Sequence, residues 1–234
     1  MKKIILSAVC LASVLTASAQ HRIGTFSVTP RVGVSVANVT NNDMYVATET
    51  NNEEKVKSRA KLGGTAGAEV EYQAGDIYSF SLGVMYAMQG NLYKEHREYA
   101  DKTLYGISNC RMDVHELNIP LMANVYVAPG LAVKAGVQMG ILLAAKFKYK
   151  SQSINTVIID GKEQKEYGDI VKHSQSMKDQ MHTIDFAIPV GLSYEYENVV
   201  LDARYYYGLT KVFKVEDKSK NSVFTFTVGY KFNL

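Results

Sequence analysis

A stretch with a strict period of two constrains the fold of this chain more than any other feature. Residues 77–89 read IYSFSLGVMYAMQ. Alternate positions separate large apolar side chains from small or polar ones: Tyr78, Phe80, Leu82, Val84, Tyr86 and Met88 against Ser79, Ser81, Gly83, Met85, Ala87 and Gln89. Because successive side chains of a β-strand point to opposite faces, the pattern predicts a strand with one apolar face. The stretch exceeds the roughly 5–6 residues of a soluble strand and reaches the ~9–11 residues of a tilted transmembrane strand.

The same alternation recurs along the chain and predicts eight strands. Their ranges are 26–37, 60–73, 77–89, 113–127, 131–149, 182–196, 199–212 and 222–234. Long polar loops follow the first, third, fifth and seventh strands, at 38–59, 90–112, 150–181 and 213–221, whereas tight turns follow the second, fourth and sixth. We expect Gly75 to supply a positive φ in the first of these turns.

An even number of strands with alternating long and short connections is typical of an outer-membrane barrel. In a bilayer every backbone N–H and C=O must be paired, so the sheet has to close. We therefore expect an all-β fold, an eight-stranded antiparallel up-and-down transmembrane β-barrel with four long outer loops and short periplasmic turns. A soluble lipocalin-like ligand-binding barrel, with the apolar face inside, is the alternative.

The apolar faces of these strands are expected to contact lipid. The proposed lipid contacts include Leu82, Val84, Leu121, Ile188 and Val228. In the fifth strand we expect the same face to continue through Ala145, Phe147 and Tyr149.

The polar faces carry glycines and charged residues, and they are expected to line the lumen. Six acids and four bases lie there: Arg31, Glu69, Glu71, Glu116, Lys134, Asp185, Glu195, Asp202, Arg204 and Lys231. The interior of an eight-stranded barrel is narrow, and the glycines leave space for these long side chains. The sequence therefore predicts a lumen plugged by paired charges and no open pore.

The N-terminus has the three parts of a secretory leader. Lys2 and Lys3 precede an apolar stretch from Ile4 to Leu15, and residues 17–19 form a small-x-small cleavage site. We expect a signal peptide at 1–19 and an outer-membrane β-barrel domain at 20–234, in a Gram-negative cell envelope. Without the two leader lysines, the 26 Lys and Arg residues become 24 against 23 Asp and Glu. That balance gives no argument for nucleic-acid binding.

The sequence contains little that points to chemistry. Its five histidines have no neighbouring ligands at metal-binding spacing, and no nucleophile elbow or phosphate loop occurs. We expect no catalytic residue, metal or cofactor, and the single mature cysteine, Cys110, excludes an internal disulfide. His115 or His182 beside Asp113 or Asp185 would allow an acid–base pair at the rim, as in outer-membrane acyltransferases or proteases. That enzyme is kept as an alternative.

Three strand motifs carry a resemblance to a known family. They are ELNIPLMANVY at 116–126, FAIPVGLSY at 186–194 and LDARYYYGLT at 201–210. In this order they resemble the PorT-like outer-membrane β-barrel family of Bacteroidota, which is similar in fold to small OmpA/OmpX-type barrels. The resemblance implies location and fold, and it suggests a component of a secretion or envelope-assembly system as an alternative function.

The long loops exceed what is needed to join antiparallel strands, and loops on a rigid scaffold often carry binding residues. We expect a non-enzymatic monomer with a structural or surface-interaction role, in contact with outer-membrane lipid and with envelope or surface proteins. Exposed tyrosines give contact area at low entropic cost. The candidate loop anchors are Tyr45, Tyr93, Tyr99, Tyr105 and Tyr167.

Overall fold

The computed structural model describes residues 22–48, 52–100, 103–159, 162–215 and 218–234. The expected signal peptide at 1–19 lies outside the described residues. Eight long strands form a ring: β1 (Phe26–Thr40), β4 (Ser58–Gln73), β5 (Tyr78–Tyr93), β7 (Thr103–Ala128), β8 (Leu131–Ile159), β10 (Ile184–Tyr196), β11 (Val199–Gly208) and β12 (Lys220–Tyr230). The other described elements are β2 (Met44–Ala47), β3 (Glu53–Val56), β6 (His96–Ala100), β9 (Lys162–Ser176), β13 (Phe232–Asn233) and the 3₁₀ helix η1 (Lys178–Gln180).

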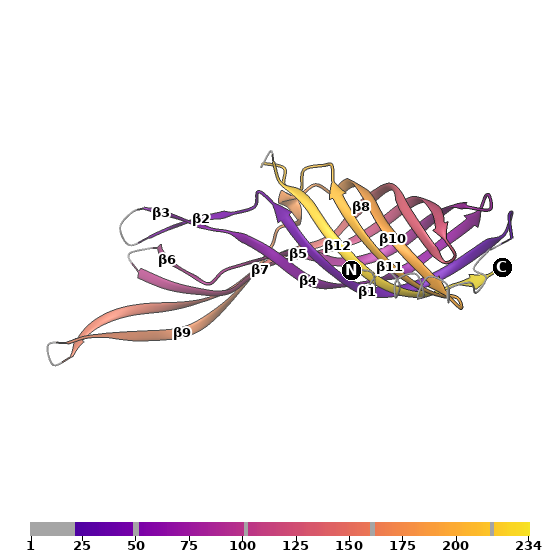
Figure 1. The fold of residues 1–234 in the computed structure, drawn as a ribbon. Helices are drawn as coiled ribbons and strands as arrows, with labels where there is room; N and C mark the ends of the chain where they lie inside the picture. The colour runs from indigo at the N-terminus through magenta and orange to yellow at the C-terminus, as the bar shows by residue number, and fades with distance from the viewer. Residues whose placement is uncertain (1–21, 49–51, 101–102, 160–161, 216–217) are drawn as a thin grey trace, which may run out of the picture.

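The eight long strands close into an antiparallel up-and-down barrel (Figure 1). The ring closes at β1, which pairs with β4 on one side and with β12 on the other. Arg31 on β1 faces Gly67 on β4 and Gly229 on β12. The predicted fold class is confirmed. Among the described residues, no helix is long and apolar enough to cross a membrane.

The two faces of the barrel wall differ in polarity as the alternation predicts. Leu82 and Val84 are 53% and 51% exposed on the outer surface, and the proposed lipid contacts at Leu121, Ile188 and Val228 are exposed as well. Ser79 and Ser81, from the other face of the same strand, are buried. A lipocalin-like barrel would have the opposite arrangement, so that alternative is wrong.

The three short turns are built in different ways. Glu197 and Asn198 both have positive φ, 45° and 70°, as the two central residues of a type I′ hairpin turn require. Gly130, between β7 and β8, also has a positive φ of 73°. The expectation for Gly75 is wrong, because its φ is not positive. A Cβ there would lie 2.3 Å from the Tyr78 ring, so close packing explains this glycine.

A β-bulge in β8 changes which side chains face inward. His115 on β7 faces Ala144, but Glu116 faces Leu142, so Leu143 is an extra residue on β8. A bulge shifts the phase of the alternation by one. The prediction that Ala145, Phe147 and Tyr149 continue the lipid-facing side is therefore wrong: Ala145 is buried, and the two aromatic rings pack against interior clusters.

The lumen glycines serve two purposes. A Cβ on Gly140 would lie 2.7 Å from the Asp185 carboxylate, so this glycine makes room for a charged side chain, as expected. A Cβ on Gly33 would instead lie 1.9 Å from the carbonyl oxygen of Phe226 on β12. Neighbouring strands thus approach closely in this strongly curved wall, and only glycine fits at such contacts.

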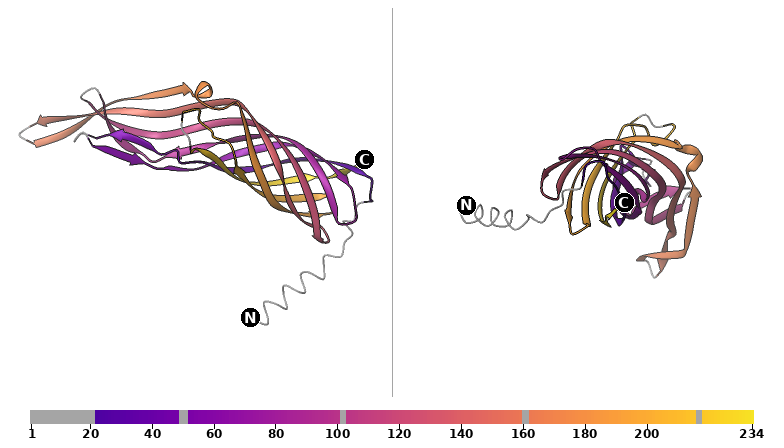
Figure 2. Two further views of the ribbon diagram at one scale, coloured as in Figure 1. Left: turned by 90° about the horizontal axis from the view of Figure 1, so that it is seen from above. Right: turned by 90° about the vertical axis from the view of Figure 1, so that its right-hand side faces the viewer.

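The long connections contain regular structure that extends well beyond one end of the barrel (Figures 1 and 2). The strands β7 and β8 continue past the wall, and β6 and β9 pair with their outer edges to give a four-stranded sheet in the order β6-β7-β8-β9. The hairpin β2–β3 extends from the same end. We call these six segments, which are β2, β3, β6, β9 and the parts of β7 and β8 beyond the barrel wall, the outer platform. The C-terminus lies at the opposite end, beside the short turns.

Candidate functional site

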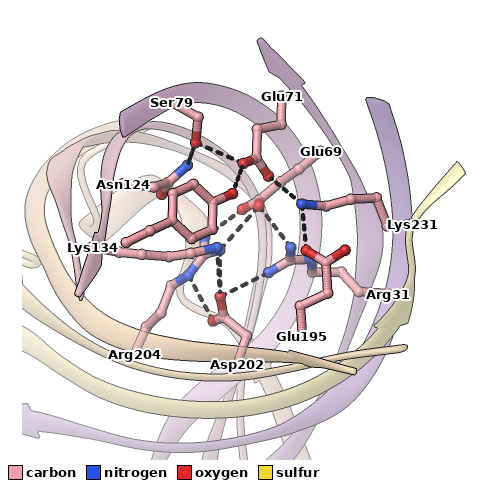
Figure 3. A network of polar contacts seen from close by, with 11 residues as sticks. Arg31, Glu69, Glu71, Ser79, Asn124, Lys134, Glu195, Asp202, Arg204 and Lys231 are labelled. Atoms are coloured by element: carbon pink, nitrogen blue, oxygen red, sulfur yellow. Dashed lines mark hydrogen bonds and ion pairs between the residues drawn. The ribbon is translucent and has the colours of Figure 1, made fainter. Parts of the chain in front are cut away.

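A network of buried ion pairs fills the middle of the barrel (Figure 3). Arg31 contacts Glu69 at 2.8 Å and Asp202 at 3.1 Å. Arg204 donates from Nη2 to Glu69 at 3.0 Å and to Asp202 at 2.8 Å. Lys134 reaches the same Asp202 carboxylate at 3.2 Å. Each carboxylate is therefore shared between two or three cations from different strands.

A second part of the network lies nearer the short turns. Lys231 bridges Glu71 at 3.3 Å and Glu195 at 2.7 Å. Ser79 donates to Glu71 at 2.6 Å, and Tyr126 donates to the same carboxylate at 2.5 Å. These hydrogen bonds satisfy lone pairs that a single ion pair would leave unmatched.

The eight residues of the network balance in charge, with four bases and four acids: Arg31, Lys134, Arg204 and Lys231 against Glu69, Glu71, Glu195 and Asp202. The cavity beside them has a volume of about 30 Å³. That volume holds one or two water molecules. The side chains therefore obstruct a continuous aqueous path.

The other two predicted lumen charges lie apart from this network. Glu116 accepts a hydrogen bond of 3.4 Å from Asn221 Nδ2, and Asp185 lies against Gly140. Neither forms an ion pair within the described residues. Both line the small cavity together with Asn118, whose buried Oδ1 has no hydrogen-bond partner.

A further charge cluster lies at the outer mouth, and the alternation of the strands did not predict it. Asp113 accepts contacts from Lys61 at 2.6 Å, Lys148 at 2.9 Å and Arg111 at 3.4 Å. Lys61 lies an even number of positions from Glu69 in β4, so both side chains point into the barrel. Extending the alternation toward the loop would have predicted that Lys61 faces inward. The register shift between β7 and β8 changes which residues face inward beyond the bulge. The inward orientation of Asp113 and Lys148 was therefore not predicted.

The hypothetical acid–base pairs at the rim do not form. Nδ1 of His115 and Oη of Tyr86 share a hydrogen bond of 2.5 Å, and the two rings stack. Asp113 instead pairs with its three basic neighbours. For His182, no side-chain hydrogen bond or ion pair is found in the described part of the chain. Within those ranges, no group of three or more His, Cys, Asp or Glu side chains could hold a metal ion.

The outer platform has a hydrophobic core of its own. Buried residues from four strands form it: Val46, Val56, Tyr93, Ile107 and Cys110. Phe147 and Tyr149, turned inward by the bulge in β8, pack against it. The connections are therefore held by packing, which their polar sequence did not predict.

The five candidate anchor tyrosines differ in accessibility. Tyr45 and Tyr167 are 63% and 55% exposed. Tyr93 is buried and meets the Phe147 ring edge-on, so its prediction as an exposed anchor is wrong. Tyr105 packs against the platform core, and Tyr99 is half-buried.

Two groups of the platform have shifted pKa values. Asp43 accepts a 2.8 Å hydrogen bond from the Ser58 backbone N–H and pairs with Lys55 at 3.0 Å. These two contacts, the hydrogen bond first, lower the pKa of the Asp43 carboxyl. Burial, with a smaller effect from Glu98, raises the pKa of the Cys110 thiol to about 12. The thiol is thus neutral at physiological pH.

The family assignment rests on most of the length of the chain. Residues 17–214 match the family described as outer membrane protein beta-barrel domain. The chain belongs to this family. Together with the closed ring and its apolar outer face, this makes the protein an integral β-barrel protein of the outer membrane. The predicted location in the outer membrane is confirmed.

Several solved barrels are similar to the chain. The attachment invasion locus protein Ail of Yersinia pestis is 15% identical, with 90% of this chain and 100% of that one covered and a TM-score of 0.44. Neisserial surface protein A is 12% identical, with 88% and 97% covered and a TM-score of 0.42. The outer-membrane protease OmpT of Escherichia coli is 8% identical, with 94% and 100% covered and a TM-score of 0.40. No curated protein matches the chain.

Proposed function

We propose that this protein is a non-enzymatic outer-membrane barrel that presents a rigid binding surface outside the cell. The barrel anchors the chain in lipid as a monomer, the paired charges plug its lumen, and the outer platform contacts envelope or surface proteins. The finer assignment to the PorT-like group, which rests on the three strand motifs, is part of this proposal.

The observation that carries the proposal is the hydrophobic core of the platform. A connection that only shields the barrel mouth needs no such core, because water satisfies its backbone. Here Val46 and Val56 of the β2–β3 hairpin pack with Ile107 and Cys110 of β7. Packing of this kind lowers the entropy that a loop loses when it binds.

Exposed apolar side chains continue beyond the membrane-facing belt onto the platform. Ile170 and Val171 on β9, shortly after the exposed Tyr167, are 59% and 51% exposed, and Ile158, nearer the hairpin turn on β8, is 75% exposed. Large apolar side chains exposed to water on this hairpin are candidate contacts for a partner. These residues, with Tyr45 on β2, are the proposed contacts.

The enzyme alternative is not favoured by the geometry. Of the acid–base partners suggested at the rim, Asp113 pairs with three cations and His115 contacts Tyr86. No side-chain partner of His182 is found among the described residues. No feature of the described residues points specifically to a role in secretion or envelope assembly, and the assays below distinguish that role from surface attachment.

The test shortens each platform hairpin without disturbing the register of the wall. Two-residue turns replace the chain between Met44 and Val56, between Arg97 and Gly106, and between Lys148 and Ser174, because each pair faces across its two strands. Each variant is first checked for insertion by heat-modifiable migration. Growth, surface attachment and secretion are then compared with the parent.

We expect at least the β8–β9 variant to insert normally and to lose surface attachment. A loss confined to secretion would favour the assembly-system role. The exposed Tyr167→Ser should reproduce part of the defect, and Gln164→Ser on the same strand serves as its control. If all three shortened variants insert and match the parent in every assay, the proposed function is wrong.

A further inference from the structure

All four long connections converge on one hollow at the outer mouth of the barrel. Its volume is about 610 Å³. The first connection contributes Asn42 and Met44, the second Tyr93 and Met112, the third Met177 with two glutamines, and the fourth Phe213 and Val215, while Phe147 comes from β8. The full lining is Asn42, Met44, Tyr93, Met112, Phe147, Gln175, Met177, Gln180, Phe213 and Val215.

Among the described residues, the lining of this hollow contains no ionisable acid or base other than a tyrosine phenol. Charged residues make up 21% of the whole chain. None of the ten lining residues is Asp, Glu, Lys or Arg, although the Asp113 charge cluster lies at the same end of the barrel. Three methionines and two phenylalanines make up half of the ten lining residues. Binding sites for small molecules have this size and character, with a mainly apolar wall and a few polar groups.

The wall is preformed on one side. Met112 is 2% exposed and belongs to a packed cluster with Val114, Leu142 and Met181. Phe147, Met177 and Phe213 pack against the same cluster and also line the hollow. A ligand would therefore meet a packed surface, and the flexible methionines adapt to its shape.

Polar groups occur at the rim. The side chains of Gln175 and Gln180 are exposed and make no hydrogen bond within the described residues. Val215, at the same rim, is 93% exposed. The amides can donate to or accept from a neutral ligand group, whereas an ionised group would find no partner of opposite charge in the lining.

We infer that this hollow binds an uncharged, mainly apolar small molecule with a neutral hydrogen-bonding group, such as a long-chain alcohol, ester or amide. The hollow is a binding site without a through-path, because the lumen below holds only a cavity of about 30 Å³. The inference deepens the proposed surface role, since it names a ligand class for the same outer end of the protein. The ligand comes either from the medium or from the outer leaflet, as an acyl chain.

The absence of tryptophan from the chain permits a specific test. Phe213→Trp places a single fluorophore in the wall of the hollow, and Phe226→Trp places one on the lipid-facing surface, where Phe226 is 53% exposed. Each full-length variant is reconstituted in nanodiscs and titrated with bromododecanol, because bromine quenches tryptophan on contact.

We expect saturable quenching in Phe213→Trp that unbrominated dodecanol reverses. Dodecanoate should compete about tenfold less well, because its carboxylate would be desolvated without a partner. Adding Met177→Glu should remove the saturable part, whereas Met177→Leu should preserve it. In Phe226→Trp the quenching should rise in proportion to the alcohol dissolved in the bilayer.

A second titration with nanodiscs of brominated phosphatidylcholine and no alcohol distinguishes the two sources. Quenching of Phe213→Trp that is sensitive to Met177→Glu identifies a bilayer chain as the occupant, and its absence identifies a ligand from the medium. Heat-modifiable migration confirms that each variant is folded.

The inference is overturned if folded Phe213→Trp shows only proportional quenching like Phe226→Trp, unaffected by dodecanol and by Met177→Glu. That result would leave the proposed surface role standing if the shortened hairpins still lost attachment. Conversely, saturable binding with unchanged attachment in all hairpin variants would remove the proposed role and retain the ligand site.

Discussion

The lumen charges show how strongly one side chain depends on its neighbours. Arg204 is shared between Glu69 and Asp202, and all three are almost fully buried. A buried ion pair is weak evidence for net stability, because desolvation opposes the attraction. Removal of one partner is different, since it leaves the buried network with a net charge that is not compensated.

We predict that Arg204→Met lowers the free energy of unfolding by about 3–5 kcal/mol, as measured by urea unfolding in lipid. Glu69→Gln combined with Arg204→Met should cost less than the sum of the two single changes, because the buried network again balances, with three bases and three acids. Simple additivity of the two changes would contradict a coupled network.

Cys110 gives a second test at this scale. The thiol is 2% exposed in the platform core, and burial raises its pKa to about 12. Because only the thiolate reacts readily, iodoacetamide at neutral pH should leave the folded protein unmodified and alkylate it after unfolding. Mass spectrometry reads the difference, and rapid modification of the folded protein would mean that the platform core opens in solution.

The alternation predicted which lumen charges exist but not which of them pair. Eight of the ten form the network, whereas Glu116 and Asp185 lie in another layer of the lumen. The alternation shows which face of a strand a side chain is on. It does not show the register between strands, which decides how far Glu116 and Asp185 lie from the network. The prediction for Tyr93 was wrong because the connection around it is mostly polar in sequence. Its few apolar residues meet those of other connections in a small hydrophobic core.

Individual strands were the most predictable elements. Their outer faces expose large apolar side chains at alternate positions, and Val84 near the middle of β5 is 51% exposed. The bulge at Leu143 was not predictable, because residues 142–145 read Leu-Leu-Ala-Ala and fit either phase. The partner strand decides the phase there.

Val84→Arg tests the outward assignment. An arginine facing lipid near the bilayer midplane should cost about 2–4 kcal/mol, whereas Val127→Arg, close to a short turn, should cost about 0–1 kcal/mol. Heat-modifiable migration and urea midpoints in lipid measure both. Equal stability of Val84→Arg and the parent would mean that this face does not meet lipid.

The whole molecule combines a closed membrane anchor with a structured exterior. Barrel closure and the filled lumen follow from strand number, charge and glycine content, which are all legible in the sequence. The platform and its hollow could not be predicted in this way, because they depend on contacts among four connections that are far apart in the chain.

A filled lumen predicts electrical silence. Purified protein in planar bilayers should give little or no conductance, because the ion-pair network leaves only a water-sized cavity. A porin inserted in the same bilayers provides the positive control. Stable large pores would contradict the plugged barrel.

The join between β1 and β12 also has a kinetic consequence. Arg31 faces Gly229, which is 198 positions later in the chain, whereas every other pair of ring neighbours is joined by a shorter connection. Contacts between distant residues form slowly, because a large loop must close first. Until they form, two strand edges are unpaired in lipid and prone to join other chains. Gly33 lies at this join, with no room for a Cβ beside Phe226. We therefore expect changes along the join to lengthen the time that the barrel needs to close.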